Sequence, residues 1–272
     1  MGVRLVALDI DGTIVPKESP HGLKLPLPSA RIRRAVRTLQ RAGIAVVLAT
    51  GRMYRGTAAV ARALELETPL ICQQGCAIHN PDGSLRHVFR IDGSIARDVA
   101  AFARERGHPY EWFDPFRYVV SRPTPESALY ARLSGVEPEY HPSPEALGFV
   151  PTGVGIISTP SEAPEVHRQL QALHGEAVHL LDFPSVTVAV APEANKGHAL
   201  ALVAAELGVD REEVVAVGDS VNDAPMLAWA GLGLTVAHAD RYARDAADNI
   251  VGEGEDDVAA FLEALASRAR RR

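Results

Sequence analysis

The chain has 272 residues, long enough for one large domain or two linked modules, since a typical domain has about 100–200 residues. Apolar residues make up 47% and charged residues 23% of it, which excludes wholesale disorder, a collagen-like repeat and a coiled-coil rod. The 28 Lys and Arg against 34 Asp and Glu give a net charge of −6, without the basic surplus of a nonspecific nucleic-acid or membrane-surface binder. We therefore expect neither nucleic acid nor a membrane as a partner. No apolar run of about 18–20 residues and no signal-peptide core is present, which predicts a cytoplasmic protein.

The first part of the chain alternates apolar strands with helices. Val3–Leu8 is β-branched and aliphatic without polar alternation, which is typical of a strand buried on both faces of a parallel sheet. Apolar residues at helical spacing then predict a helix around Ile32–Leu39, which Gly43 ends. The next predicted elements are a strand at Ile44–Ala49, a helix at about Gly56–Leu64 and a strand at Pro69–Cys72. This alternation indicates βαβ units and therefore a doubly wound parallel sheet.

The pattern changes in the middle of the chain. A turn at Pro81–Gly83 is predicted between short strands at Ala77–His79 and Leu85–Phe89. The elements predicted after it are a helix at Ile95–Arg106, hairpin strands at Tyr110–Phe113 and Tyr118–Ser121, a strand at Gly155–Ser158, a helix at Pro164–Leu173, and strands at Val178–Leu181 and Val186–Val190. Arg122–Pro151 is rich in Pro and Ser, and we assign no element there.

The α/β pattern resumes at Lys196. The predicted elements are a helix from Lys196 to Leu207, a strand at Val214–Val217, a helix from about Asn222, a strand at Leu232–Val236 and a helix at Asp256–Ala266. The sequence therefore predicts an open α/β sheet that an α+β insertion interrupts. We expect Arg268–Arg272 to be a solvent-exposed tail.

Polar residues follow several of the predicted buried strands. Asp9 and Asp11 come after the first strand, Thr50 after the second, and Asp219 and Asp223 after the strand that ends at residue 217. In open α/β sheets, ligands bind outside the carboxyl ends of the strands, so these side chains are expected to converge. One such aspartate alone would more often cap a helix. Several of them together indicate a ligand site.

The residue types in this predicted site suit phosphoryl chemistry. Clustered carboxylates raise each other's pKa unless a cation lies among them, and hard oxygen ligands suit Mg²⁺. Because Mg²⁺ shares its ligand shell with substrate phosphate, another carboxylate remains available as a nucleophile that forms an aspartyl-phosphate. Lys196 and the Thr50 hydroxyl have the chemistry to stabilise a transferring phosphoryl group.

Four motifs occur in order and together cover nearly the whole chain. They are DIDGT at Asp9–Thr13, LATGR at Leu48–Arg52, NKG at Asn195–Gly197 and GDSVNDAPM at Gly218–Met226. With them the sequence resembles the haloacid dehalogenase-like superfamily of phosphohydrolases and, within it, the Cof-type, sugar-phosphatase-like subfamily with a class II cap. The resemblance implies an α/β fold: a Rossmann-like, doubly wound parallel sheet core at residues 1–82 and 185–272, with an inserted α+β cap domain at residues 83–184.

The resemblance also implies roles for the residues at the strand ends. Asp9 would be the nucleophile and a metal ligand, and Asp219 the distal metal ligand. Asp11 would protonate the leaving group, activate water and bind the metal through its backbone carbonyl. Asp223 would be a metal ligand or a group that orients metal-bound water or Lys196. The implied cofactor is Mg²⁺.

The remaining motif residues would hold the phosphate. Thr50 and Gly51 resemble the phosphate-binding pair, Asn222 a further phosphate contact, and Lys196 the cation that neutralises nucleophile and phosphoryl group. Arg52 is predicted to contact the phosphate, although an arginine that opens a helix is also commonly solvated. The chain departs from the family at Gln74-Gly75, where Asn-Gly is frequent, so a substrate contact could be longer or absent.

The predicted function is Mg²⁺-dependent hydrolysis of a small phosphorylated metabolite, such as a sugar phosphate, through an aspartyl-phosphate. One alternative is a phosphomutase, because the same motifs serve transfer of the phosphoryl group to a second hydroxyl. Another is a catalytically idle binding protein on the same fold. The sequence gives no prediction of oligomeric state.

Overall fold

The computed structural model describes residues 2–16 and 25–269, and the chain divides into two compact units. The first unit consists of Met1–Arg86 and Asn195–Arg272, and the second of His87–Ala194. The chain therefore leaves the first unit once and returns to it once. The predicted insertion at residues 83–184 shares most of its residues with the second unit, which also takes in the strand Val186–Val190.

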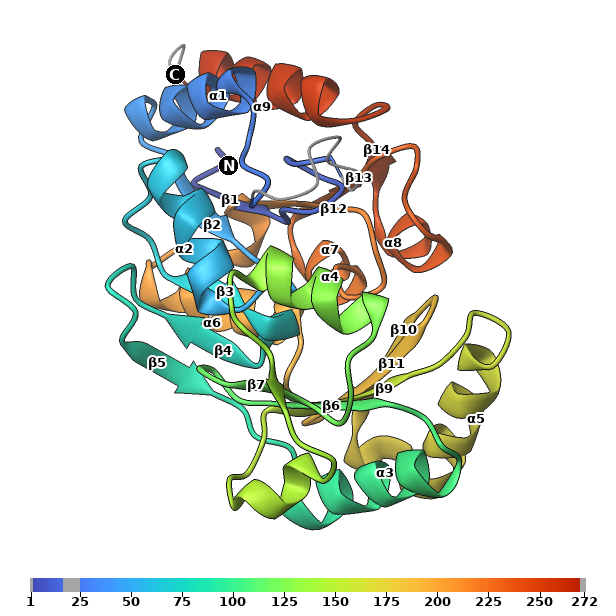
Figure 1. Ribbon diagram of the computed structural model, residues 1–272. Helices are drawn as coiled ribbons and strands as arrows, with labels where there is room; N and C mark the ends of the chain where they lie inside the picture. The colour runs from blue at the N-terminus through green and yellow to red at the C-terminus, as the bar shows by residue number, and fades with distance from the viewer. Residues whose placement is uncertain (1, 17–24, 270–272) are drawn as a thin grey trace. The chain divides into compact units, whose positions relative to one another are not determined.

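The first unit is built around a five-stranded sheet of order β14-β13-β12-β1-β2 in which every pair is parallel. Figure 1 shows α1 and α9 together on one side of this sheet and α6 and α7 on the other. The unit contains β1 (Leu5–Leu8), α1 (Ala30–Arg41), β2 (Ala45–Leu48), α2 (Tyr54–Ala63), β3 (Leu70–Cys72), β4 (Ala77–His79), β5 (Leu85–Val88, which runs into the second unit), α6 (Lys196–Glu206), β12 (Val214–Gly218), α7 (Ala224–Trp229), β13 (Leu232–Thr235), α8 (Arg241–Ala246), β14 (Asn249–Ile250) and α9 (Glu255–Ala269). The predicted parallel α/β core is confirmed.

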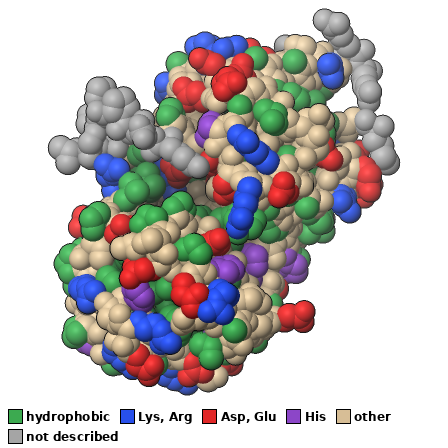
Figure 2. All heavy atoms as spheres, turned by 90° about the vertical axis from the view of Figure 1, so that its right-hand side faces the viewer, with side chains coloured by type: hydrophobic (Ala, Val, Ile, Leu, Met, Phe, Trp, Pro, Cys, Tyr) green, Lys and Arg blue, Asp and Glu red, His purple; other side chains and the backbone are tan. Residues whose placement is uncertain are grey.

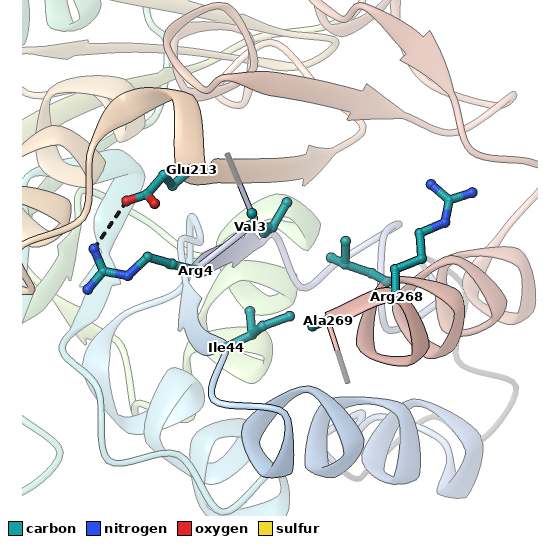
Figure 3. Close-up of a pocket in the computed structure, with 8 residues that line it drawn as sticks. Val3, Arg4, Ile44, Glu213, Arg268 and Ala269 are labelled. Carbon is teal, nitrogen blue, oxygen red and sulfur yellow. Dashed lines mark hydrogen bonds and ion pairs between the residues drawn. The ribbon is translucent and has the colours of Figure 1, made fainter. Parts of the chain in front are cut away.

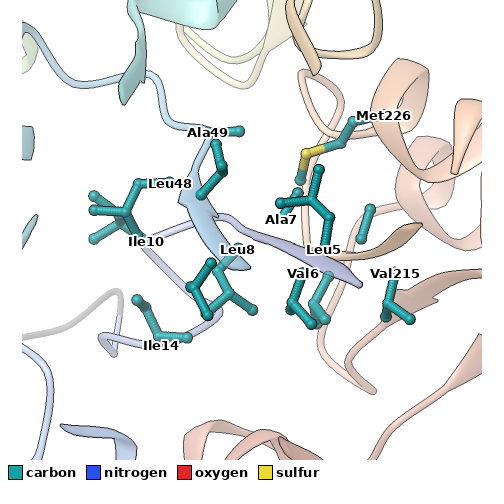
Figure 4. Packing of buried hydrophobic residues seen from close by; sticks show 14 of the residues in the cluster. Leu5, Val6, Ala7, Leu8, Ile10, Ile14, Leu48, Ala49, Val215 and Met226 are labelled. Atoms are coloured by element: carbon teal, nitrogen blue, oxygen red, sulfur yellow. The ribbon is translucent and has the colours of Figure 1, made fainter. Parts of the chain in front are cut away.

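Strand β1 is the centre of the apolar core of this unit. All four of its residues are fully buried, and they pack with Ile10, Leu48 and Met226 (Figure 4). Burying one such aliphatic side chain contributes about 1.5–3 kcal/mol, so the central strands are strongly fixed in place. The polar residues that follow β1 and β12 are therefore held on a rigid scaffold.

Strand β3 departs from the simple parallel series that the sequence suggests. It pairs antiparallel with β4 in a separate sheet of order β3-β4-β5, and a single parallel bridge between Ala49 and Ile71 connects it to the end of β2. The reason lies in the turn after Cys72, where Gln73, Gln74 and Gly75 all have positive φ, at 49°, 64° and 98°. This left-handed turn sends the chain back along β3 as β4.

The second unit is a six-stranded sheet of order β10-β11-β9-β6-β7-β8, antiparallel except for the pair β7–β8. Tyr110, Trp112, Val154 and Ile156 form a buried cluster with apolar residues of α3 and α5. The elements are α3 (Gly93–Glu105), β6 (Tyr110–Phe113), β7 (Tyr118–Val120), α4 (Pro125–Ser134), β8 (Glu139–Tyr140), β9 (Gly153–Ile157), α5 (Ala163–His174), β10 (His179–Phe183) and β11 (Val186–Val190). The predicted α+β character is confirmed. Helix α4 and strand β8 occupy the stretch in which we assigned no element.

The surface carries charges of both signs, and Figure 2 shows acidic and basic side chains interspersed on the face that it presents. Within the described residues, no helix combines the length and the apolar character that crossing a membrane requires. Of the predicted C-terminal tail, Arg268 and Ala269 end α9, and residues 270–272 lie outside the described part of the chain.

Candidate active site

Three carboxylates meet at the carboxyl ends of β1 and β12. Asp9 directly follows β1, and its backbone N–H donates a hydrogen bond of 2.9 Å to the Val217 carbonyl of β12. Asp219 directly follows β12. Each of Asp9, Asp219 and Asp223 places one carboxylate oxygen within 4.8 Å of the other two, and all three residues are buried. The parallel pairing of the two strands thus brings together residues some 200 positions apart in the sequence.

Lys196 is the cation within this carboxylate cluster. Its side chain is fully buried, and its Nζ donates to Asp9 Oδ1 at 2.8 Å and to Asp223 Oδ1 at 2.6 Å. It is the first residue of α6, whose N-cap Asn195 accepts a hydrogen bond of 2.8 Å from the His198 N–H. The helix start therefore fixes the position of the lysine, because the cap determines where α6 begins.

The carboxylate cluster contains more negatively charged groups than positively charged ones. Burial raises the pKa of Asp9 well above its usual value, and the Asp223 and Asp219 carboxylates raise it further against the opposing effect of Lys196. Burial by itself would lower the pKa of Lys196, but the Asp223 and Asp9 carboxylates raise it above the usual lysine value. Three carboxylates thus surround one ammonium group, and a further cation is needed to keep all of them ionised.

Because of this excess of negative charge, the cluster of Asp9, Asp219 and Asp223 fits a divalent metal ion. Carboxylate oxygens are the hard donors that Mg²⁺ prefers, and it completes its shell with water and substrate oxygen rather than with protein groups alone. Asp9 and Asp219 are the carboxylates best placed to bind the metal ion. Both oxygens of Asp223 already accept hydrogen bonds, from Lys196 and from the backbone of the turn that carries Asp219. The Asp11 carboxylate is not part of this cluster, so the expected contribution of that residue would come from its backbone carbonyl.

Asp223 holds both Lys196 and the turn that carries Asp219. Its Oδ2 accepts the backbone N–H of Asp219 at 2.9 Å and that of Ser220 at 3.0 Å, while Oδ1 accepts from Lys196. The side chain folds back against Gly218, where a Cβ would come within 2.5 Å of it. These contacts favour the orienting role for Asp223 over direct metal ligation.

The predicted phosphate-binding residues lie beside the turn that follows β3. The Thr50 hydroxyl accepts the Arg52 backbone N–H at 3.1 Å, which leaves the hydroxyl hydrogen to donate to another group. A Cβ on Gly51 would lie 2.8 Å from Gln74 Nε2, so glycine makes room for the Gln74 side chain. Asn222 donates a hydrogen bond to Gln74 Oε1. Gln74 therefore lies against Gly51 and bonds Asn222, at the position where the family resemblance leads us to expect asparagine.

Asp11 and Arg52 form an ion pair. The Arg52 Nε and Nη2 atoms donate to the two carboxylate oxygens of Asp11 at 2.7 and 2.6 Å. Gly12, with φ of 90°, closes the tight turn after Asp11, and its N–H donates to the Val15 carbonyl at 2.7 Å. The structure thus joins Arg52 to Asp11, whereas the sequence predicted a phosphate contact or a solvated arginine.

Two residues at the site were not among those predicted. Gln74 was noted only as a departure from the family pattern, and the Gln-Gln-Gly sequence gives little warning of three successive positive φ angles. His238 Nε2 lies 2.9 Å from the Gly12 carbonyl and 4.0 Å from Asp219 Oδ2. Its closeness to the strand Leu232–Thr235 was the one available signal, since loops after neighbouring parallel strands share an edge.

A pocket of about 400 Å³ opens at the opposite ends of the strands of the same sheet (Figure 3). Val3 and Arg4 precede β1, Ile44 precedes β2 and Glu213 precedes β12, so the pocket lies at the amino ends of the strands. The Arg4 guanidinium is paired with Glu213 at 3.1 Å. In open α/β sheets the carboxyl ends carry the chemistry, so we do not assign the reaction to this pocket.

Comparison with known proteins finds relatives that match over nearly the whole of this chain and of their own length. A family model described as haloacid dehalogenase-like hydrolase matches residues 6–262. The phosphatase YwpJ of Bacillus subtilis is 28% identical over 91% of this chain and 94% of its own length. A phosphoglycolate phosphatase of Methanopyrus kandleri is 29% identical over 96% of each chain.

A solved structure agrees with the fold. A haloacid dehalogenase-like hydrolase from B. subtilis superposes with a TM-score of 0.82 at 24% identity, covering 97% of this chain and 100% of its own. At that identity the likeness shows the arrangement of the elements rather than the substrate.

Proposed function

Since this chain belongs to the haloacid dehalogenase-like hydrolases, we propose that it is a Mg²⁺-dependent phosphatase that hydrolyses a small phosphorylated metabolite through an aspartyl-phosphate on Asp9. The observation that supports this most is the buried carboxylate of Asp9, which accepts a hydrogen bond from Lys196 and lies beside Asp219 and Asp223. The names of the relatives, phosphatase and phosphoglycolate phosphatase, agree with a phosphate monoester as substrate.

In the first step, a carboxylate oxygen of Asp9 attacks phosphorus, and the bond from phosphorus to the leaving-group oxygen breaks. Asp11, once protonated, would give that proton to this oxygen, so the leaving group departs as an alcohol. The Lys196 ammonium lies 2.8 Å from Asp9 Oδ1 and offsets the charge that gathers on the transferring group. Thr50 and Asn222 would orient the phosphoryl oxygens.

In the second step, Asp11 accepts a proton from water as the water attacks phosphorus. The bond between phosphorus and Asp9 breaks, which restores the carboxylate and releases inorganic phosphate. Asp9 and Asp219, with the Asp11 carbonyl, would hold Mg²⁺, which supplies positive charge against the phosphoryl oxygens. Asp223 keeps Lys196 and the Asp219 turn in place throughout.

The second unit is the part of the chain that we assign to recognition of the leaving group. The family resemblance implies a cap inserted between the second and third motifs, and His87–Ala194 occupies that place in the sequence. A cap that excludes bulk water would protect the aspartyl-phosphate from premature hydrolysis. The identity of the alcohol then depends on side chains of this unit.

A phosphate-release screen tests the proposal. The wild-type protein with Mg²⁺ should release phosphate from some members of a panel of sugar, polyol and carboxylic-acid phosphates, and an Asp9→Asn variant should release none. Isomerisation of a sugar phosphate without net release would favour a phosphomutase instead. Failure to hydrolyse even an aryl phosphate would favour an idle binding protein.

A further inference from the structure

Every backbone N–H group of the turn Asp219–Val221 donates a hydrogen bond to a carboxylate. Those of Asp219 and Ser220 donate to Asp223 Oδ2, at 2.9 and 3.0 Å. That of Val221 donates to Asp240 Oδ2 at 2.7 Å. Asp223 is the N-cap of α7 and Asp240 the N-cap of α8, so two different elements bind the turn. Because bonds to an ionised acceptor are the stronger ones, the conformation of the turn depends on both carboxylates.

Asp240 makes a second hydrogen bond to the same turn. Its own backbone N–H donates to the Asp219 carbonyl at 2.9 Å, while its side chain binds the Val221 N–H. Just before it in the chain, at the end of β13, the Thr235 hydroxyl donates to the Gly218 carbonyl at 2.8 Å. The segment that leads from β13 to α8 therefore fixes the backbone both before and after Asp219.

The capping of α8 does not by itself account for Asp240. Its Oδ1 accepts the Ala243 N–H at 3.0 Å, which is the N-cap bond of that helix. A cap needs one acceptor oxygen, which Ser supplies as well as Asp, and Thr nearly as well. A hydroxyl in reach of Ala243 would leave the Val221 N–H without its carboxylate, whereas the two oxygens of Asp240 reach both N–H groups.

We infer that Asp240 is a positioning residue for metal binding, which acts on Asp219 through the backbone of this turn. The inference rests on the proposed function only in taking Asp219 as a Mg²⁺ ligand. In the described part of the chain, the carboxylate cluster consists of Asp9, Asp219 and Asp223, so we assign Asp240 no direct contact with the ion. Removing a group that orients a metal ligand typically weakens metal binding by about 10–100-fold.

Calorimetric titration of the substrate-free protein with Mg²⁺ tests this role. Asp240→Ser keeps the cap of α8 and loses the bond to Val221, so we expect its Kd for Mg²⁺ to be at least about 10-fold above the wild-type value. Asp245→Ser removes an exposed carboxylate of the same helix and is the matched control, with a Kd within about 2-fold of wild type. An unchanged Kd in Asp240→Ser would overturn the inference, and so would a wild-type protein that binds no Mg²⁺.

Salt distinguishes positioning from a simple loss of negative charge near the ion. A long-range attraction between Asp240 and Mg²⁺ would fade as the Debye length falls from about 10 Å at 0.1 M salt to about 3 Å at 1 M. Positioning through hydrogen bonds does not depend on that length. We therefore expect the Kd of Asp240→Ser to remain at least about 10-fold above that of wild type in 1 M KCl. A ratio that falls to unity in high salt would contradict the inference.

The dependence of the phosphatase rate on Mg²⁺ gives a second readout. In Asp240→Ser, the Mg²⁺ concentration for half-maximal kcat should rise by the same factor as Kd, while kcat at saturating Mg²⁺ should stay within about 3-fold of wild type. A purely structural defect would lower kcat at every Mg²⁺ concentration and leave the half-maximal concentration unchanged. That second pattern would mean that Asp240 only stabilises the fold.

Asp240→Thr is a second variant, for the case in which Asp240→Ser does not fold. Its hydroxyl also caps a helix with one acceptor oxygen, so the same rise in Kd is expected. A protein whose Mg²⁺ affinity depends on Asp240 but which releases no phosphate would contradict the proposed function alone. A protein that releases phosphate with a Mg²⁺ affinity independent of Asp240 would contradict this inference alone.

Discussion

Lys196 is the residue on which the charge balance of the carboxylate cluster depends. It is fully buried and bonded to two of the three carboxylates, which themselves have little access to water. Removing one partner of a buried ion pair leaves an uncompensated buried charge, which typically costs about 3–5 kcal/mol. Its role is therefore structural as well as chemical.

For Lys196→Met we expect a loss of about 3–5 kcal/mol in the free energy of unfolding, measured by urea denaturation in the presence of EDTA. The loss should be smaller with Mg²⁺, because the divalent ion would replace part of the missing positive charge. Arg33→Met, at an exposed position of α1, is the control and should stay within about 0.5 kcal/mol of wild type. A Lys196→Met variant as stable as wild type in EDTA would refute this charge balance.

Glu111 is a second buried carboxylate, in β6 of the other unit. It is 5% exposed, and the Tyr118 hydroxyl donates a hydrogen bond to its Oε1. Burial raises its pKa from 4.5 to about 7, partly opposed by the Tyr118 bond and assisted by the Glu126 carboxylate. The folded protein thus holds this proton more tightly than the unfolded chain does.

The raised pKa of Glu111 makes the free energy of unfolding depend on pH. The tighter binding of the proton by Glu111 in the folded state adds to the free energy of unfolding. This contribution is fully present below pH 4.5 and is lost as the pH rises through about 7. A Glu111→Gln variant cannot ionise, so between pH 5 and pH 8 it should gain up to about 3 kcal/mol of unfolding free energy relative to wild type. Urea denaturation of both proteins at the two pH values measures this, and a pH-independent difference would contradict it.

At the scale of the elements, the start of α6 is positioned by its close contact with α7. A Cβ added to Gly197 would lie 2.4 Å from the Pro225 carbonyl, so glycine is what allows the two helices to meet there. Gly197 follows Lys196, and Pro225 lies two residues after Asp223. The contact therefore sets the distance between the two ends of an ion pair in the site.

Gly197→Ala should force α6 and α7 apart at this point and destabilise the protein by about 1–3 kcal/mol, the usual cost of overpacking. It should also lower phosphatase activity, because the Lys196–Asp223 distance would lengthen. His198→Ala is the matched control, since His198 is the next residue and is exposed. If Gly197→Ala changed neither the thermal unfolding of the protein nor its rate of phosphate release, this prediction would be contradicted.

The elements that the sequence predicts well are those with long apolar patterns. Strand β1 and helix α1 are found because Leu5–Leu8 is wholly aliphatic and Ile32, Val36 and Leu39 recur on one face. Helix α4 escapes prediction because its buried residues are Ser127, Ala131 and Ser134, which are small or polar and give no apolar period. Its signals were only the cap Thr124 before Pro125 and Gly135 after its end.

The sequence draws attention to single residues of the candidate site but not to the contacts between them. The motifs draw attention to Asp9, Lys196 and Asp219 because each lies in a recognisable sequence. The Arg52–Asp11 pair and the Gln74–Asn222 bond join residues 41 and 148 positions apart, and only the folded chain brings them together. Periodicity carries no information about such pairs.

At the scale of the whole molecule, net charge and local charge act differently. The chain carries a net charge of −6, which would repel an anionic substrate at long range. At the carboxyl ends of β1 and β12 the nearby positive groups matter more, and these are Lys196 and the proposed Mg²⁺. A surplus of acidic residues is therefore compatible with a phosphorylated substrate.

Mg²⁺ should stabilise the folded protein as a whole, because the unfolded chain has no assembled carboxylate cluster. At a free concentration roughly 100 times its Kd, it should add about 2.7 kcal/mol to the free energy of unfolding. Asp219→Asn should abolish most of this gain, whereas Asp114→Asn, at a carboxylate of the other unit, should keep it. Equal stabilisation of both variants would mean that the ion binds elsewhere.

The most direct measurement of the central claim is identification of the phosphorylated residue. Wild-type protein is mixed with p-nitrophenyl phosphate and Mg²⁺, quenched in acid within one turnover, digested and analysed by mass spectrometry. We predict one additional phosphoryl group on Asp9, and none anywhere in an Asp9→Asn variant. Release of phosphate by a wild-type protein that never carries this group, or a phosphoryl group that persists in the variant, would contradict the account.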